Sequence, residues 1–118
     1  PHKNELDRHD LVWKNQIIEV KTFGKNNSWC NFYERDKGKQ FDWLYVFTYN
    51  PDIKVIACCG YIHRKNLMTD QNYSDDLPLV VGNVKSTTTG WKVPFSKLTP
   101  HGEGPLFNKE GLSNARYV

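Results

Sequence analysis

Two adjoining segments constrain the fold of this chain most strongly. Residues 42–49, DWLYVFTY, are apolar on both alternating faces and rich in aromatic and β-branched side chains, which is typical of a central β-strand. Residues 50–52, NPD, follow directly and favour a turn. Residues 53–62, IKVIACCGYI, then predict a second strand in which Gly60 marks a bulge or the strand end. The chain is therefore expected to be built around a β-sheet.

An earlier segment, residues 10–22, reads DLVWKNQIIEVKT and places charges inside an apolar pattern. It predicts a β-hairpin with Lys14 and Asn15 as the two-residue loop. A loop at this position sets the register, because each residue before it then faces one residue after it. The residues expected to face one another are Trp13 and Gln16, Val12 and Ile17, Leu11 and Ile18, and Asp10 and Glu19.

This register brings three charged side chains to one face of the hairpin. Residues directly opposite in an antiparallel pair share a face, so Asp10 lies beside Glu19. Lys21 is two residues after Glu19 and shares that face too, because side chains alternate along a strand. Ile18 and Val20 are expected to point the other way, into the core.

Two carboxylates that face each other destabilise a sheet unless a cation lies between them. A divalent metal with oxygen ligands would serve, and Mg²⁺ is usually held by one or two carboxylates together with waters and phosphate oxygens. The alternative is an ordinary half-exposed hairpin in which Lys21 neutralises Glu19. A slip of one residue would also separate Asp10 from Glu19.

The order Asp10, then Glu19-Val20-Lys21 and Thr22, resembles the PD-(D/E)xK nuclease superfamily over residues 10–65. The resemblance implies an α/β fold with a restriction-endonuclease-like core. We expect a mixed sheet of about five strands with one or two helices. The family places a helix after the ExK strand, and the i, i+3, i+4 spacing of aromatic side chains in residues 29–35 predicts one there.

The resemblance also implies a function, namely metal-dependent hydrolysis of DNA phosphodiester bonds, most simply by an endonuclease. Asp10 and Glu19 would ligate Mg²⁺ or Mn²⁺, the Val20 carbonyl would be a third ligand, and Lys21 would be the catalytic lysine. His9 stands where the family often has proline, and Glu5 is the only nearby match to the acidic residue of the family's first helix. The basic side chains expected to contact the nucleic-acid backbone are Lys25, Arg35, Lys37, Lys39, Arg64 and Lys65.

The 118 residues suit a single domain over residues 1–118, and a net charge of +3 is compatible with DNA without requiring it. The chain begins at Pro1, which suggests a product trimmed from a longer chain. Residues 69–90 carry few regular signals apart from a short strand at residues 79–81. Residues 91–98 are expected to form an edge strand, because Pro94 cannot donate to a central ladder, and residues 99–118 are expected to be irregular.

The remaining expectations concern the setting and the rival functions. No segment approaches the ~20 apolar residues of a membrane span, and three cysteines without a CxxC pair suggest reduced thiols in a cytoplasmic protein. A homodimer would suit an enzyme that cuts both DNA strands. The main alternative is a non-catalytic nucleic-acid-binding module, either an inactive nuclease fold or a small β-rich domain. A protein-interaction domain is a third interpretation.

Overall fold

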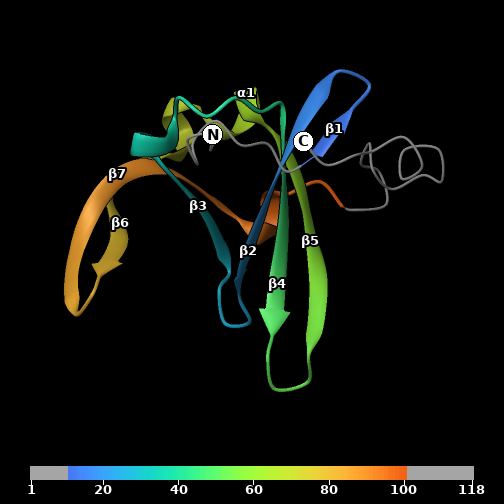
Figure 1. Ribbon diagram of the computed structural model, residues 1–118. Helices are drawn as coiled ribbons and strands as arrows, with labels where there is room; N and C mark the ends of the chain where they lie inside the picture. The colour runs from blue at the N-terminus through green and yellow to red at the C-terminus, as the bar shows by residue number, and fades with distance from the viewer. Residues whose placement is uncertain (1–10, 101–118) are drawn as a thin grey trace, which may run out of the picture.

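The computed structural model describes residues 11–100, and it contains two β-sheets with few helices (Figure 1). The protein is thus a small mixed α/β domain made mostly of strands. Within residues 11–100, three 3-10 turns and one short helix, α1 (Arg64–Leu67), connect the strands. The strands are β1 (Leu11–Trp13), β2 (Gln16–Gly24), β3 (Trp29–Tyr33), β4 (Trp43–Asn50), β5 (Val55–His63), β6 (Tyr73–Val81) and β7 (Val84–Pro94). The 3-10 turns are η2 (Glu34–Asp36), η3 (Asp70–Asn72) and η4 (Phe95–Lys97).

The first sheet has the strand order β1-β2-β4-β5, and the second has the order β3-β7-β6. In the first sheet β2 runs parallel to β4, whereas β1 and β5 are antiparallel to their neighbours. The second sheet is antiparallel throughout. Figure 1 shows β6 and β7 curving away from β4 and β5. We expected about five strands in one mixed sheet, so the strands of the second sheet are the principal difference.

The strands predicted at residues 42–49 and 53–62 are confirmed as β4 and β5, which pair with each other. The register shifts by one residue between Val46 and Phe47 of β4. Gly60 lies at this shift with a φ of 132°, a backbone conformation that side chains with a Cβ rarely adopt. The bulge predicted at Gly60 is therefore confirmed.

The helix predicted over residues 29–35 is wrong, because residues 29–33 form β3 and only Glu34–Asp36 turn as η2. Cys30 and Phe32 are buried on the inner face of β3. Trp29 points outward, with 45% of its surface exposed. The burial thus alternates with the period of a strand, and the aromatic spacing that suggested a helix does not define a buried face.

Residues 69–90, where few regular signals were expected, mostly form the hairpin of β6 and β7. The short strand predicted at residues 79–81 is confirmed as the end of β6. Only Leu77 is buried in β6, and the first half of β7 is exposed and polar. Without an alternating apolar pattern, the rest of β6 and the first half of β7 gave no strand signal.

The strand predicted over residues 91–98 is confirmed for residues 91–94, the end of β7. Its edge position is wrong, because β7 lies in the middle of its sheet. Pro94 is tolerated there as the last residue of the strand.

The main core lies between the two sheets. Phe32 from the second sheet and Leu44 and Val46 from the first belong to one buried cluster, which Leu67 of α1 joins. A second cluster of Ile18, Tyr45 and Tyr61 lies on the opposite face of the first sheet. The first sheet is consequently packed on both faces.

The hairpin register predicted for β1 and β2 is confirmed by three pairs: Trp13 with Gln16, Val12 with Ile17, and Leu11 with Ile18. Lys14 and Asn15 have φ angles of 47° and 64°, as a type I′ turn requires. The Asp10 position and residues 101–118 lie outside the described residues.

This turn leads to a first prediction, because asparagine tolerates positive φ better than lysine does. We expect Lys14→Asn to raise the free energy of unfolding by about 0.5 kcal/mol, measured by urea denaturation. Lys85→Asn, in the exposed strand β7, should bring no gain, because asparagine is unfavourable in strands. A gain of equal size in both variants would contradict this interpretation of the turn.

Candidate functional site

Strand β2 places Glu19 and Lys21 on the face that turns toward the second sheet. Ile17 and Phe23, which share this face by alternation, pack against the core between the sheets. Ile18 belongs to the cluster on the opposite face, as expected. The charged residues of β2 therefore lie on an inner face, among apolar side chains.

Glu19 is buried, with only 5% of its surface exposed. Its Oε2 atom lies 2.6 Å from the Nζ atom of Lys39, whose side chain is itself only 18% exposed. A buried carboxylate costs free energy unless it is paired or binds a metal. The lysine that neutralises Glu19 in this structure is thus Lys39, a residue that the sequence analysis assigned to the nucleic-acid backbone.

Arg64 holds the loop that carries Lys39. Its guanidinium donates hydrogen bonds to the backbone carbonyls of Lys39 and Lys37, at 2.6 and 2.5 Å. The same group lies 4.7 Å from the ring centroid of Phe41. Arg64 therefore positions Lys39 against Glu19.

Asp42 also belongs to this site, and the sequence analysis did not select it. Its Oδ2 atom accepts a hydrogen bond of 2.7 Å from the backbone N–H of Ile17. Its own backbone N–H donates to the Ile17 carbonyl, and its carbonyl accepts from the N–H of Arg64. Asp42 thereby ties the start of β2 to α1. A polar residue directly before an apolar strand was the only sequence signal for this role.

Lys21 lies between β2 and the second sheet, with its Nζ atom 5.4 Å from the ring centroid of Phe32. It is also close enough to Cys30 to affect the thiol electrostatically. Burial raises the pKa of Cys30 to about 12, and the positive charge of Lys21 opposes part of that shift. Cys30 is consequently a neutral core thiol, and all three cysteines are free.

The predicted metal ligands are only partly within the described residues. Glu19 and Val20 are adjacent in β2, whereas Asp10 lies outside them. Within residues 11–100, no group of three or more His, Cys, Asp or Glu side chains is arranged to hold a metal ion. A metal site here would therefore need Asp10 in addition to Glu19 and the Val20 carbonyl.

The six basic residues expected to contact nucleic acid do not form a single cluster. Lys37 and Lys39 lie near Arg64, which binds both of their carbonyls, and Lys65 follows in α1. Lys37 is 3.7 Å from Glu34, and Arg35 lies over the Tyr33 ring at 5.0 Å. Lys25 forms an ion pair with Asp52 beyond the far end of β2. Four of the six residues therefore lie near one another around the start of α1, namely Lys37, Lys39, Arg64 and Lys65. Lys25 lies apart from them.

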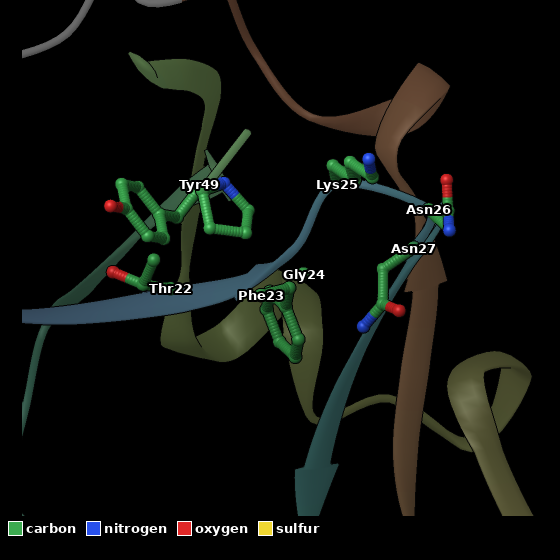
Figure 2. A pocket seen from close by; sticks show the side chains of 8 residues that line it. Thr22, Phe23, Gly24, Lys25, Asn26, Asn27 and Tyr49 are labelled. Carbon is green, nitrogen blue, oxygen red and sulfur yellow. The ribbon is translucent and has the colours of Figure 1, made fainter. Parts of the chain in front are cut away.

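A hollow of about 560 Å³ lies at the far end of β2, where the β2–β3 and β4–β5 turns meet. Figure 2 shows Tyr49 beside Thr22 on one side of it, and Asn26 and Asn27 on the other. Gly24 in its wall is five residues beyond Glu19, or about 16 Å along a strand. Thr22, next to Lys21, is the lining residue of this hollow nearest to Glu19 in β2, and neither Glu19 nor Lys21 lines it.

Comparison with family models, with curated proteins and with solved structures gave no match. Among residues 11–100, no helix has the length and apolar character needed to cross a membrane. The functional proposal below therefore rests on the residues and their geometry.

Proposed function

We propose that the protein is a metal-dependent nuclease of the PD-(D/E)xK type that hydrolyses phosphodiester bonds in DNA. Asp10 and Glu19 would hold the metal, and Lys21 would be the catalytic lysine. The observation that carries the proposal is the hairpin register, which puts the buried Glu19 one pair beyond Leu11 and Ile18. Lys21 follows on the same face of β2.

The donor set suits a hard divalent cation. Two carboxylates and the Val20 carbonyl offer oxygen ligands only, which Mg²⁺ and Mn²⁺ prefer. When bound, such an ion supplies Lewis-acid polarisation of the phosphate and lowers the pKa of a water that it binds. Glu19 is already held in a buried position by β2, so metal binding would require displacement of the Lys39 ammonium but no movement of the strand.

The chain's own side chains supply positioning and charge. Lys21 offers an ammonium group that can orient the attacking water and neutralise negative charge developing on the phosphate. Lys39 neutralises Glu19 until a cation takes its place. Phe32 and Cys30, which flank Lys21, provide an apolar wall that strengthens these electrostatic interactions.

A second function is favoured by one specific observation, the Glu19–Lys39 ion pair. Because this pair compensates the buried carboxylate without any metal, the domain could be a non-catalytic nucleic-acid-binding module. Such a module would bind DNA with strong salt dependence and cleave it in neither Mg²⁺ nor Mn²⁺. The nuclease proposed above would instead cleave DNA in the presence of Mg²⁺ or Mn²⁺.

Lys39→Met provides a test of metal binding that does not depend on activity. In EDTA we expect this variant to lose about 3 kcal/mol of unfolding free energy, because a buried carboxylate loses its partner. Mn²⁺ should then stabilise the variant more than the original protein, by about 1.4 kcal/mol at ten times its Kd. Urea denaturation with and without Mn²⁺ measures both effects.

The matched control is Lys37→Met on the same loop, since Lys37 pairs with the more exposed Glu34. It should change stability little and leave the response to Mn²⁺ as it was. Combining Lys39→Met with Glu19→Gln should remove the response. If Mn²⁺ stabilises Lys39→Met no more than Lys37→Met, the metal site at Glu19 is contradicted.

A further inference from the structure

Three hollows away from Glu19 adjoin one another through shared lining residues. The first, of about 430 Å³, shares Ile62, Asn66 and Lys97 with the second, of about 310 Å³. The second shares Asn72 and Lys97, among others, with the third, of about 390 Å³. Lys97 of η4 lines all three. The three adjoining hollows, which pass α1, η3 and η4, are here called the α1 groove.

The charged side chains that line the α1 groove are basic, and Asp76 lies near enough to Lys92 to interact with it electrostatically. Lys65, Lys92 and Lys97 line it together with His63, and no described lining residue is Asp or Glu. Lys65 and Lys97 are exposed. In a chain with 13 acidic residues, a groove whose described walls carry lysines alone is complementary to a polyanion.

Aromatic rings lie at both ends of this groove. Trp43 and Tyr61 line the first hollow, and Trp29 and Tyr73 line the third. Trp29 and Tyr73 are 45% and 43% exposed, and the Lys92 ammonium lies 5.1 Å from the Trp29 ring centroid. Exposed rings next to lysines allow bases to stack while their phosphates meet positive charge.

We propose that the α1 groove binds a single-stranded segment of nucleic acid. Unpaired bases can stack on Trp29 and Tyr73, whereas a duplex keeps its base faces covered. The amide side chains of Asn66 and Gln71, both exposed, line the second hollow between the two aromatic ends and can contact bases or sugars.

This inference rests on the proposed function and specifies its substrate. Glu19 pairs with Leu44, which pairs with Ile62 in the wall of the groove. Two strand spacings separate Glu19 from Ile62, or about 10 Å. A strand in the α1 groove would thus run along the β5 edge of the first sheet, about two strand spacings from Glu19. The substrate specified in this way is DNA with an unpaired segment.

The test is binding of a fluorescently labelled oligo(dT) of about 15 nucleotides in EDTA, where cleavage does not occur. For single strands, log K falls with log salt by about 0.7 per phosphate contact. Lys65→Gln with Lys97→Gln should therefore reduce the slope by about 1.4. The matched pair Lys54→Gln with Lys85→Gln, in the exposed β4–β5 and β6–β7 hairpins, should leave the slope unchanged.

A second pair of variants tests how much the aromatic rings contribute to oligo(dT) binding. Trp29→Ala should weaken oligo(dT) binding roughly 5- to 150-fold, as loss of one stacked base implies. Tyr49→Ala removes another exposed ring, in the hollow of Figure 2, and should have no effect. Circular dichroism would establish that each variant keeps its fold.

Three results would overturn the inference: equal effects of the groove and control variants, competition by duplex DNA as strong as by oligo(dT), or equal displacement by polyglutamate. The two proposals fail separately. Mg²⁺-dependent cleavage with no effect of the groove variants contradicts only the α1 groove. Binding that depends on the groove, without cleavage in Mg²⁺ or Mn²⁺, contradicts only the nuclease.

Discussion

Lys21→Ala is expected to lower Mg²⁺-dependent DNA cleavage by at least about 100-fold, the usual minimum for a positioned catalytic group. The substitution removes the ammonium group on the Glu19 face of β2, so neither the attacking water nor the developing phosphate charge is supported. Gel assays on plasmid and on single-stranded DNA measure the loss. Binding of oligo(dT) in EDTA should persist, because Lys21 does not line the α1 groove.

Lys21→Met separates the loss of charge from the loss of packing. It keeps an apolar stem of similar length beside Phe32, so it should be as inactive as Lys21→Ala but more stable. Lys54→Ala, on an exposed turn, should cleave normally. Full cleavage by Lys21→Met would refute a catalytic role for the lysine.

Gly60→Ala is expected to have the largest effect on stability, a loss of roughly 3 kcal/mol or more. A Cβ at this position would lie 2.5 Å from the Thr99 carbonyl oxygen and 2.8 Å from the Leu98 Cβ. The φ of 132° adds backbone strain. The clash cannot be relieved by a side-chain rotation, because Thr99 exchanges two backbone hydrogen bonds with Tyr61.

Gly24→Ala is the matched control, since a Cβ there has nothing within 4 Å and Gly24 is also in a strand. Its free energy of unfolding should differ little from that of the original protein. Urea denaturation of both variants measures the contrast. A loss at Gly60 no larger than at Gly24 would show that the bulge adjusts to a side chain.

The parts of the fold that could be predicted were those set by local chemistry. The turn at Lys14 and Asn15 fixes the β1–β2 register, because a two-residue loop leaves few alternatives. The apolar strand β4 and its turn into β5 were equally clear. By contrast, β3 was misread because its aromatic spacing also fits a helix. Most of β6 and the first half of β7 were missed because they are exposed and carry no hydrophobic period.

The parts of the candidate site that could be predicted were also those set by local sequence. The spacing of Glu19 and Lys21 fixes their common face, but whether that face is inner or outer depends on where the second sheet packs. The Glu19–Lys39 pair joins residues 20 apart in the chain. It depends on the loop that Arg64 and Asp42 hold in place, so no local pattern could indicate it.

Direct location of the metal tests the central claim, that Glu19 binds a divalent cation. In a crystal of the protein soaked with Mn²⁺, we expect an anomalous peak about 2.1 Å from a Glu19 carboxylate oxygen, with the Lys39 ammonium displaced. An intact Glu19–Lys39 pair, with no anomalous peak at Glu19, would contradict the proposal.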